Sequence, residues 1–132
     1  QIGMDCAFFF NGGTALGEHY GEKITPLPAP LKSLKFEVIE TGVEISSRWA
    51  YENIDPRHCG KNRDQTKKLL EALHAEDAAG ILKNLHNDFE ELVFASHPLL
   101  LKKKREIESA KPGRVLLCGS GGCLTRIYSG GT

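Results

Sequence analysis

Clusters of glycine and one carboxylate are the features of this chain that could take part in phosphate or hydroxyl chemistry. Gly119, Ser120, Gly121 and Gly122 form a run in which three of four residues are glycine. In such a run backbone N–H groups can converge, and an anion or another chain can approach closely. The run has no Gly-Lys-Ser/Thr and lacks the spacing of a dinucleotide-binding fingerprint. A tight turn is therefore the simplest interpretation.

A second glycine pair and an aspartate stand near the beginning of the chain. Gly12 and Gly13 follow an apolar stretch, as in a hairpin turn, and Asp5 comes just before that stretch. A lone carboxylate in such a place is usually the cap of a helix or a turn. Neither feature predicts catalysis by itself.

The cysteines and histidines do not have the spacing of a metal site. There is no Cys-x-x-Cys, and Cys118 and Cys123 flank the glycine-rich turn without a histidine pair at zinc-finger spacing. The histidines are scattered, so each is expected at the surface or in a satisfied core position. We predict that these cysteines and histidines hold no metal. The residues are Cys6, Cys59, Cys118, Cys123, His19, His58, His74, His86 and His97.

Composition and charge favour a single soluble globular domain. The 132 residues carry 17 basic and 17 acidic side chains, and 40% of them are hydrophobic. A chain of this size can bury a core without disulfides or metal. No apolar run approaches the roughly 20 residues of a membrane span, and zero net charge argues against a general nucleic-acid binder. No secretory signal is visible, so we expect a cytoplasmic location, or the plastid stroma in a plant.

Residue patterning predicts strands towards both ends of the chain. Short apolar or alternating runs with β-branched side chains, bounded by glycine or proline, are typical of strands. Prolines at 26, 28 and 30 form a semi-rigid connector after the first group of strands. The predicted strands are 6–10, 14–16, 23–25, 34–39, 114–118 and 123–128.

The middle of the chain has helical periodicity. Ser46 and Ser47 are suitable N-cap residues, Asp77 could cap a further helix, and Pro98 begins the last one. The basic run 102–105 is expected to be a solvated face. Helices are predicted to begin near residues 47, 63, 78, 89 and 98. The order strands, helices, strands predicts an α+β fold in which helices cover an antiparallel sheet.

Taken together, these segments closely resemble a family of small-molecule kinases. The matching stretches occur in the same order and at the same spacing over nearly the whole chain. They resemble the 4-diphosphocytidyl-2-C-methyl-D-erythritol kinase family, part of the GHMP superfamily of galactokinase, homoserine kinase, mevalonate kinase and phosphomevalonate kinase. The segments are 2–10, 12–18, 21–27, 43–51, 85–90 and 117–123.

The resemblance implies ATP-dependent phosphorylation of the 2-hydroxyl of 4-diphosphocytidyl-2-C-methyl-D-erythritol, in the non-mevalonate route to isoprenoid precursors. It implies ATP, with Mg²⁺, as the phosphate donor. Asp5 falls on the family's proposed base, which accepts the proton of the substrate hydroxyl; phosphoryl transfer needs one such oriented acceptor. Met4 and Ala7 replace the family's usual Ala and Pro, which loosens the match around this base.

The same resemblance assigns a substrate pocket. Tyr51 stands where the family has the aromatic residue that stacks on the cytosine ring, and Ser47 where a small hydroxyl residue lines that pocket. Gly12 and Gly13 match a glycine pair near the substrate diphosphate. The run 119–122 matches a glycine-rich hairpin that supports the active site more than it binds phosphate.

The resemblance also implies a division of the chain. Residues 1–32 correspond to the C-terminal end of the kinase catalytic domain with its connector, and 33–132 to a truncated, ferredoxin-like second domain. The family's N-terminal lysine motif and phosphate loop would precede residue 1. We therefore expect a C-terminal fragment that is inactive as a kinase by itself.

Two other functions stay open from the sequence. The chain could come from another GHMP kinase that acts on homoserine or a mevalonate derivative, or it could be a non-catalytic α+β module for protein interaction. The run 12–18 and Tyr51 favour the cytidyl substrate over the sister kinases. Binding of a cytidine nucleotide would separate the cytidyl substrate from those of the sister kinases, and a full-length gene that lacks the phosphate loop would favour the interaction module. The oligomeric state also stays open.

Overall fold

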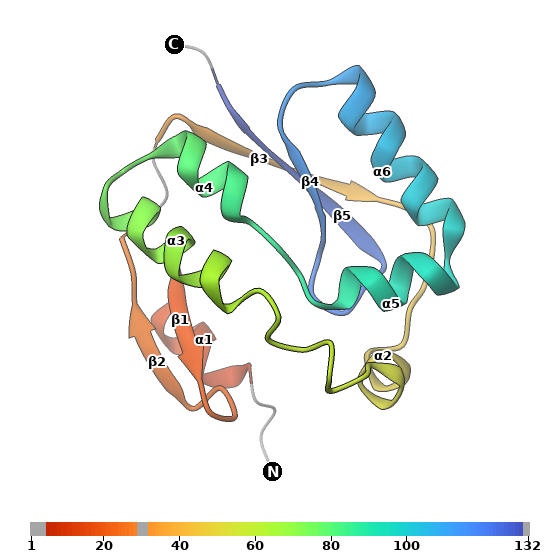
Figure 1. Ribbon diagram of the computed structural model, residues 1–132, viewed down its shortest axis with the longest axis horizontal. Coiled ribbons are helices and arrows are strands. Elements are labelled where there is room, and N and C mark those ends of the chain that lie inside the picture. Colours follow the sequence, from red (N-terminus) through yellow and green to blue (C-terminus); the bar gives the residue numbers. More distant parts are fainter. Residues whose placement is uncertain (1–4, 29–31, 131–132) are drawn as a thin grey trace.

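The computed structural model describes residues 5–28 and 32–130 (Figure 1). Met4 and Pro30, which entered the predictions above, lie outside the described residues. The described part forms six helices and five strands, and the strands are arranged in two separate sheets. Within this part, no helix has the length and apolar character needed to cross a membrane.

The first sheet is a two-stranded hairpin with a short helix beside it. β1 (Ala15–Glu18) pairs antiparallel with β2 (Lys23–Pro26), and an ion pair of 2.9 Å between Glu18 and Lys23 closes the turn end. α1 (Cys6–Asn11) contacts both strands. The two extended segments predicted after the Gly12-Gly13 turn are therefore confirmed, with slightly different bounds.

The predicted strand at 6–10 is wrong, because these residues form α1. A short apolar run has no periodicity that distinguishes a buried strand from a helix. The helix ends at Gly12, where a φ of 66° turns the chain and the backbone N–H donates to the Phe8 carbonyl at 2.7 Å. Phe9 and Phe10 are exposed, whereas the predicted strand was a buried one.

The second sheet has three strands in the order β3-β5-β4. These are β3 (Leu34–Glu40), β4 (Arg114–Leu117) and β5 (Cys123–Ser129). β5 pairs antiparallel with both neighbours, so β3 and β4 run parallel to each other on either side of it. This split βαβ arrangement is typical of ferredoxin-like sheets. The predicted α+β fold with an antiparallel sheet is confirmed.

Helices cover both faces of this sheet. Since side chains alternate along a strand, Leu116 and Ile127 face one side, where they pack with α3 (Arg63–His74) and α4 (Ala78–Asn84). Leu117 and Leu124 face the other side and pack with α5 (Phe89–Ser96) and α6 (Pro98–Ala110). Trp49 of α2 (Ser47–Asn53) joins this second core. The glycine-rich turn lies at one end of the sheet, between β4 and β5.

The predicted helix starts are confirmed. Ser46 caps α2, because its Oγ accepts a hydrogen bond from the Trp49 backbone N–H at 3.3 Å. Asp77 stands at the N-cap position of α4, and Pro98 occupies the first turn of α6. Local signals of this kind depend on only a few neighbouring residues, so they can be recognised without knowledge of the tertiary structure.

One expectation for α6 is wrong. Lys104 belongs to the basic run that was predicted to be solvated, yet it is only 9% exposed. Its ammonium group pairs with Glu90 at 2.9 Å and lies 5.3 Å from the centre of the Phe94 ring. A long side chain with an apolar stem can be buried when its charged end meets a partner. The basic run 102–105, which was predicted to be solvated, therefore includes one buried lysine that is paired with a carboxylate.

Candidate functional site

The glycine-rich hairpin is a tight turn whose shape requires glycine at defined positions. Its ends are joined by a hydrogen bond of 2.9 Å from the Cys118 N–H to the Cys123 carbonyl, and the Gly121 N–H donates to the Cys118 carbonyl at 3.0 Å. Gly121 has a φ of 138°, and a Cβ placed there would lie 2.7 Å from Cδ1 of Ile45. Both the backbone conformation and the close contact exclude larger residues at this position without rearrangement.

The beginning of α2 lies against this hairpin. The hydroxyls of Ser47 and Ser120 are 2.8 Å apart, and either can donate to the other. The Thr41 hydroxyl donates to the carbonyl of Gly122. Next to these contacts is an open groove of about 700 Å³, lined by residues 40–46 and 121–123. Two residues that the sequence analysis assigned to different motifs, Ser47 and Ser120, are thus direct neighbours.

Tyr51 lies one turn further along α2. The residue is 58% exposed, and its ring meets the ring of Phe89 edge to face, with centroids 5.0 Å apart and planes at 80°. An aromatic ring that is held from one side and still exposed can stack on a planar ligand. Trp49, by contrast, packs in the core and against His97 at 5.5 Å, so ordinary core packing explains it.

The segment 86–90, which connects α4 to α5, supports the hairpin from the other side. The Asn87 amide donates to the carbonyls of Leu117 at 2.9 Å and Gly119 at 2.7 Å. Glu90 accepts a hydrogen bond from the Leu117 N–H at 2.9 Å and pairs with Lys104 through its other oxygen. These two side chains fix the last residue of β4 and the first residue of the turn.

Sequence reasoning did not assign a role to Asn87 or Glu90. The partners of Asn87 lie 30 and 32 residues further along the chain, and no local pattern predicts such contacts. The resemblance of segment 85–90 to the kinase family was the one signal that could have pointed to this region.

Asp88 has partners on the opposite side of the same segment. Its two oxygens accept hydrogen bonds from the Gly60 N–H at 2.8 Å and from the Asn62 amide at 2.9 Å. Burial opposes ionisation of this carboxyl, but the two hydrogen bonds and the nearby His86 outweigh it, so the pKa of Asp88 is held below its usual value of 3.8. The segment therefore connects the hairpin to the loop before α3.

Asp5, Gly12 and Gly13 lie in a different part of the molecule. Asp5 is exposed at the N-terminus of α1, and both glycines have positive φ angles with open space around them. Figure 1 shows α1 beside the β1-β2 hairpin and away from α2. Of the predicted site residues, the structure brings Ser47, Tyr51 and the hairpin together, and places Asp5, Gly12 and Gly13 apart from them.

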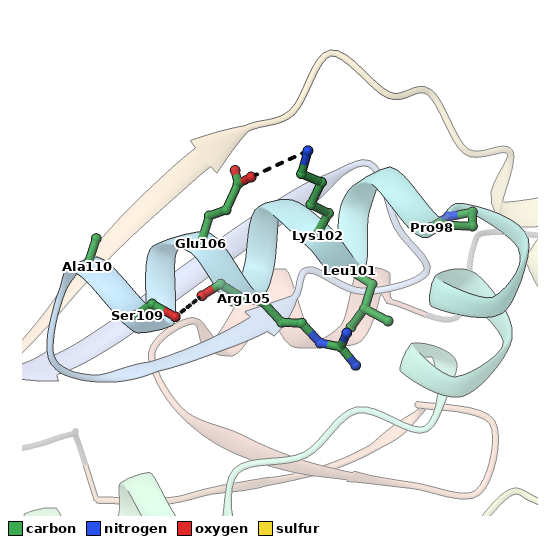
Figure 2. A pocket seen from close by; sticks show the side chains of 7 residues that line it. All are labelled: Pro98, Leu101, Lys102, Arg105, Glu106, Ser109 and Ala110. Atoms are coloured by element: carbon green, nitrogen blue, oxygen red, sulfur yellow. Dashed lines mark hydrogen bonds and ion pairs between the residues drawn. The ribbon is translucent and has the colours of Figure 1, made fainter.

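A separate hollow lies along the outer side of α6 (Figure 2). Its volume is about 670 Å³, and it contains a Lys102–Glu106 ion pair of 3.9 Å. None of the predicted site residues contributes to it. The lining residues are Pro98, Leu101, Lys102, Arg105, Glu106, Ser109 and Ala110. Among the described residues, no group of three or more His, Cys, Asp or Glu side chains could hold a metal ion.

The sequence of this chain is similar to those of known proteins. No family model matches the chain. It is 33% identical over 125 residues to 4-diphosphocytidyl-2-C-methyl-D-erythritol kinase of Gloeobacter violaceus, which covers 92% of this chain and 41% of that protein. It is 35% identical over 124 residues to the protein of the same name from Carboxydothermus hydrogenoformans, with coverages of 94% and 43%.

A solved structure shows the same fold. The crystal structure of a 4-(cytidine 5'-diphospho)-2C-methyl-D-erythritol kinase superposes with a TM-score of 0.70 at 24% identity, and the match covers 96% of this chain and 44% of that one. The chain therefore shares the fold of the matching part of that kinase. By sequence it matches the C-terminal part of the 4-diphosphocytidyl-2-C-methyl-D-erythritol kinases, which confirms the resemblance. It spans less than half the length of the relatives it matches.

Proposed function

We propose that the chain is part of an ATP-dependent kinase that phosphorylates the 2-hydroxyl of 4-diphosphocytidyl-2-C-methyl-D-erythritol. The observation that carries this proposal is the match of 92% and 94% of the chain to two curated proteins that both bear this kinase's name. In this proposal residues 1–32 complete a catalytic domain, residues 33–132 form the second domain, and the protein acts in the cytoplasm on small molecules.

Tyr51 and Ser47 are proposed to bind the cytidine end of the substrate. The exposed ring of Tyr51, braced by Phe89 at 5.0 Å, offers a flat apolar surface for a pyrimidine. The Ser47 hydroxyl lies one turn away and already bonds to Ser120, so it can exchange or share this hydrogen bond with a polar ligand atom. The hairpin 119–122 supports this wall of the pocket.

Asp5 is proposed as the acceptor of the proton from the substrate hydroxyl, and Gly12 and Gly13 as a place where the diphosphate approaches the backbone. Both glycines lack any neighbour within 4 Å of a Cβ position, which leaves space for a ligand. Phosphoryl transfer requires mainly positioning and charge stabilisation by groups around ATP. ATP is the proposed phosphate donor, and we assign no described residue to Mg²⁺.

The proposal is tested by titrating the chain with CDP and following the fluorescence of Trp49 and the NMR signals of Tyr51, with AMP as the control ligand. A response that saturates with CDP and is absent with AMP is the expected result. Tyr51→Leu should abolish this response, whereas Tyr20→Leu, which changes a tyrosine that is exposed in the β1-β2 turn, should retain it. An equal response to CDP and AMP, or none to either, would contradict a cytidine pocket in this chain.

A further inference from the structure

We propose that Asn87 is a positioning residue that holds the glycine-rich hairpin against α2 and so maintains the shape of the candidate substrate site. The hairpin contains three glycines, and glycine has the largest conformational freedom of all residues. Ordering such a turn in one conformation costs conformational entropy, which contacts from neighbouring residues can offset. The expected effect of Asn87 on ligand binding rests on the proposed function. Its effect on the conformation of the hairpin can be tested without any ligand.

The Asn87 amide uses its hydrogen-bonding groups in three directions. Its Nδ2 donates to two carbonyls on either side of Cys118, those of Leu117 and Gly119. Its Oδ1 accepts from the N–H of Phe89, the first residue of α5, at 3.0 Å. An amide offers two N–H donors and one carbonyl acceptor, so both kinds of group are engaged. Asn87 thereby links the start of a helix rigidly to the start of the turn.

Further contacts close a ring through the candidate site. From the hairpin, Ser120 bonds to Ser47 at the start of α2. From α2, Tyr51 contacts Phe89 at the start of α5. The Phe89 backbone N–H donates to Oδ1 of Asn87, and Nδ2 of Asn87 donates to the Gly119 carbonyl of the hairpin, which closes the ring. The hairpin therefore cannot move relative to Tyr51 without breaking at least one link of this ring.

Asn87→Asp is the variant that isolates this role. Aspartate has nearly the same shape, and its carboxylate can still accept from the Phe89 N–H at the N-terminus of α5, where negative charge is favourable. It has no hydrogen to donate to the Leu117 and Gly119 carbonyls. The change removes the restraint on the hairpin and leaves an acceptor for the Phe89 N–H in place.

Amide hydrogen exchange and NMR spectra of the variant provide the measurement. We expect the amide signals of Gly119, Gly121 and Gly122 to shift and the Gly121 N–H to exchange about tenfold faster, because two hydrogen bonds that restrain the turn are lost. Signals at the far end of β5, such as that of Ile127, should stay in place. Affinity for CDP should fall about tenfold for the same reason.

Asp88→Asn is the matched control. It changes the neighbouring residue by the same exchange of oxygen and nitrogen, but the partners of Asp88 are Gly60 and Asn62. It should leave the hairpin signals and CDP affinity unchanged. If Asn87→Asp does not fold, Asn87→Ser replaces it, because a serine hydroxyl can still accept from an N–H two residues further on but cannot donate to both carbonyls.

Each outcome decides between the two proposals. Hairpin signals that overlay with those of the original chain would overturn the role of Asn87, whatever the CDP result. Shifted hairpin signals in a chain that shows no CDP response would support the role of Asn87 and contradict the proposed function. Shifted signals with an unchanged CDP affinity would show that the hairpin does not shape the substrate site, which also overturns the inference.

Discussion

The chain contains two glycine turns that look alike in sequence and are held in different ways. The hairpin at 119–122 accepts hydrogen bonds from Asn87 and Thr41 and shares one with Ser47, and Gly121 packs directly against Ile45. The turn at Gly12 and Gly13 has φ angles of 66° and 65°, and nothing lies within 4 Å of a Cβ position at either residue.

The difference shows that glycine serves two purposes in one molecule. At Gly121 of the hairpin it allows a close approach of the Ile45 side chain, so the shape of the turn depends on its surroundings. In the first turn it only allows a left-handed backbone, so the shape depends on the residues themselves. A restrained turn is suited to hold other groups in place, and an open turn leaves space beside the backbone. The predictions below test this distinction.

The largest effect is expected from removing the carboxylate that anchors the hairpin. In Glu90→Ala the buried Lys104 loses its ion-pair partner and the Leu117 N–H loses its acceptor. The free energy of unfolding should fall by about 3 to 4 kcal/mol, since an unpaired buried charge is costly. Urea denaturation followed by circular dichroism measures this change.

Glu91→Ala is the control for that experiment. Glu91 is the next residue and also carries a carboxylate, but it is exposed, and its partner among the described residues is His58 at 3.4 Å. Its removal should cost less than about 0.5 kcal/mol, as is usual for surface ion pairs. Similar losses for the two variants would show that the hairpin is not anchored through Glu90.

A smaller effect is expected from substitutions within the two turns. Gly121→Ala brings a Cβ to 2.7 Å from Ile45 at a φ of 138°, so steric and backbone strain add, and the loss of unfolding free energy should be about 2 to 3 kcal/mol. Gly13→Ala meets only the backbone penalty of a left-handed residue, about 1 kcal/mol. Thermal and urea denaturation of both variants compare them. Equal losses would remove the distinction between a packed and an open turn.

Several parts of the fold could be predicted because their signals are local. The alternation in 34–39 indicated β3, and the hydroxyl of Ser46 before a helical stretch indicated α2 and its cap. The run 6–10 was assigned wrongly because its apolar residues suit a buried strand, whereas Gly12 ends a helix there. A run of five residues is too short for periodicity to decide.

The candidate site was predicted only in part because its arrangement depends on tertiary contacts. Ser47 and Ser120 came from separate motifs 73 residues apart, and the structure shows them in hydrogen-bond contact. Nothing in the local sequence indicated that Asn87 reaches the hairpin or that Lys104 is buried with Glu90. The roles of Asp5, Gly12 and Gly13 rest on the family resemblance alone, and they stay predictions.

The smallest effect concerns the other side of the segment that restrains the hairpin. Hydrogen bonds from Gly60 and Asn62 hold the pKa of Asp88 below its usual value of 3.8. A carboxyl whose pKa is lower in the folded than in the unfolded chain stabilises the fold at any pH above its unfolded value. This contribution is lost as the pH falls through the folded pKa.

The difference in unfolding free energy between the original chain and Asp88→Asn should therefore be constant above about pH 5 and should decrease below about pH 4. Urea denaturation over this pH range measures it. Because the bonds of Asp88 go to residues 60–62 and those of Asn87 go to the hairpin, the hairpin amide signals should not follow this titration. A difference that does not depend on pH would mean that the two hydrogen bonds do not favour the ionised form. Hairpin signals that titrate with Asp88 would mean that segment 86–90 transmits strain between its two sides, and the hairpin would then depend on the loop before α3 as well as on Asn87.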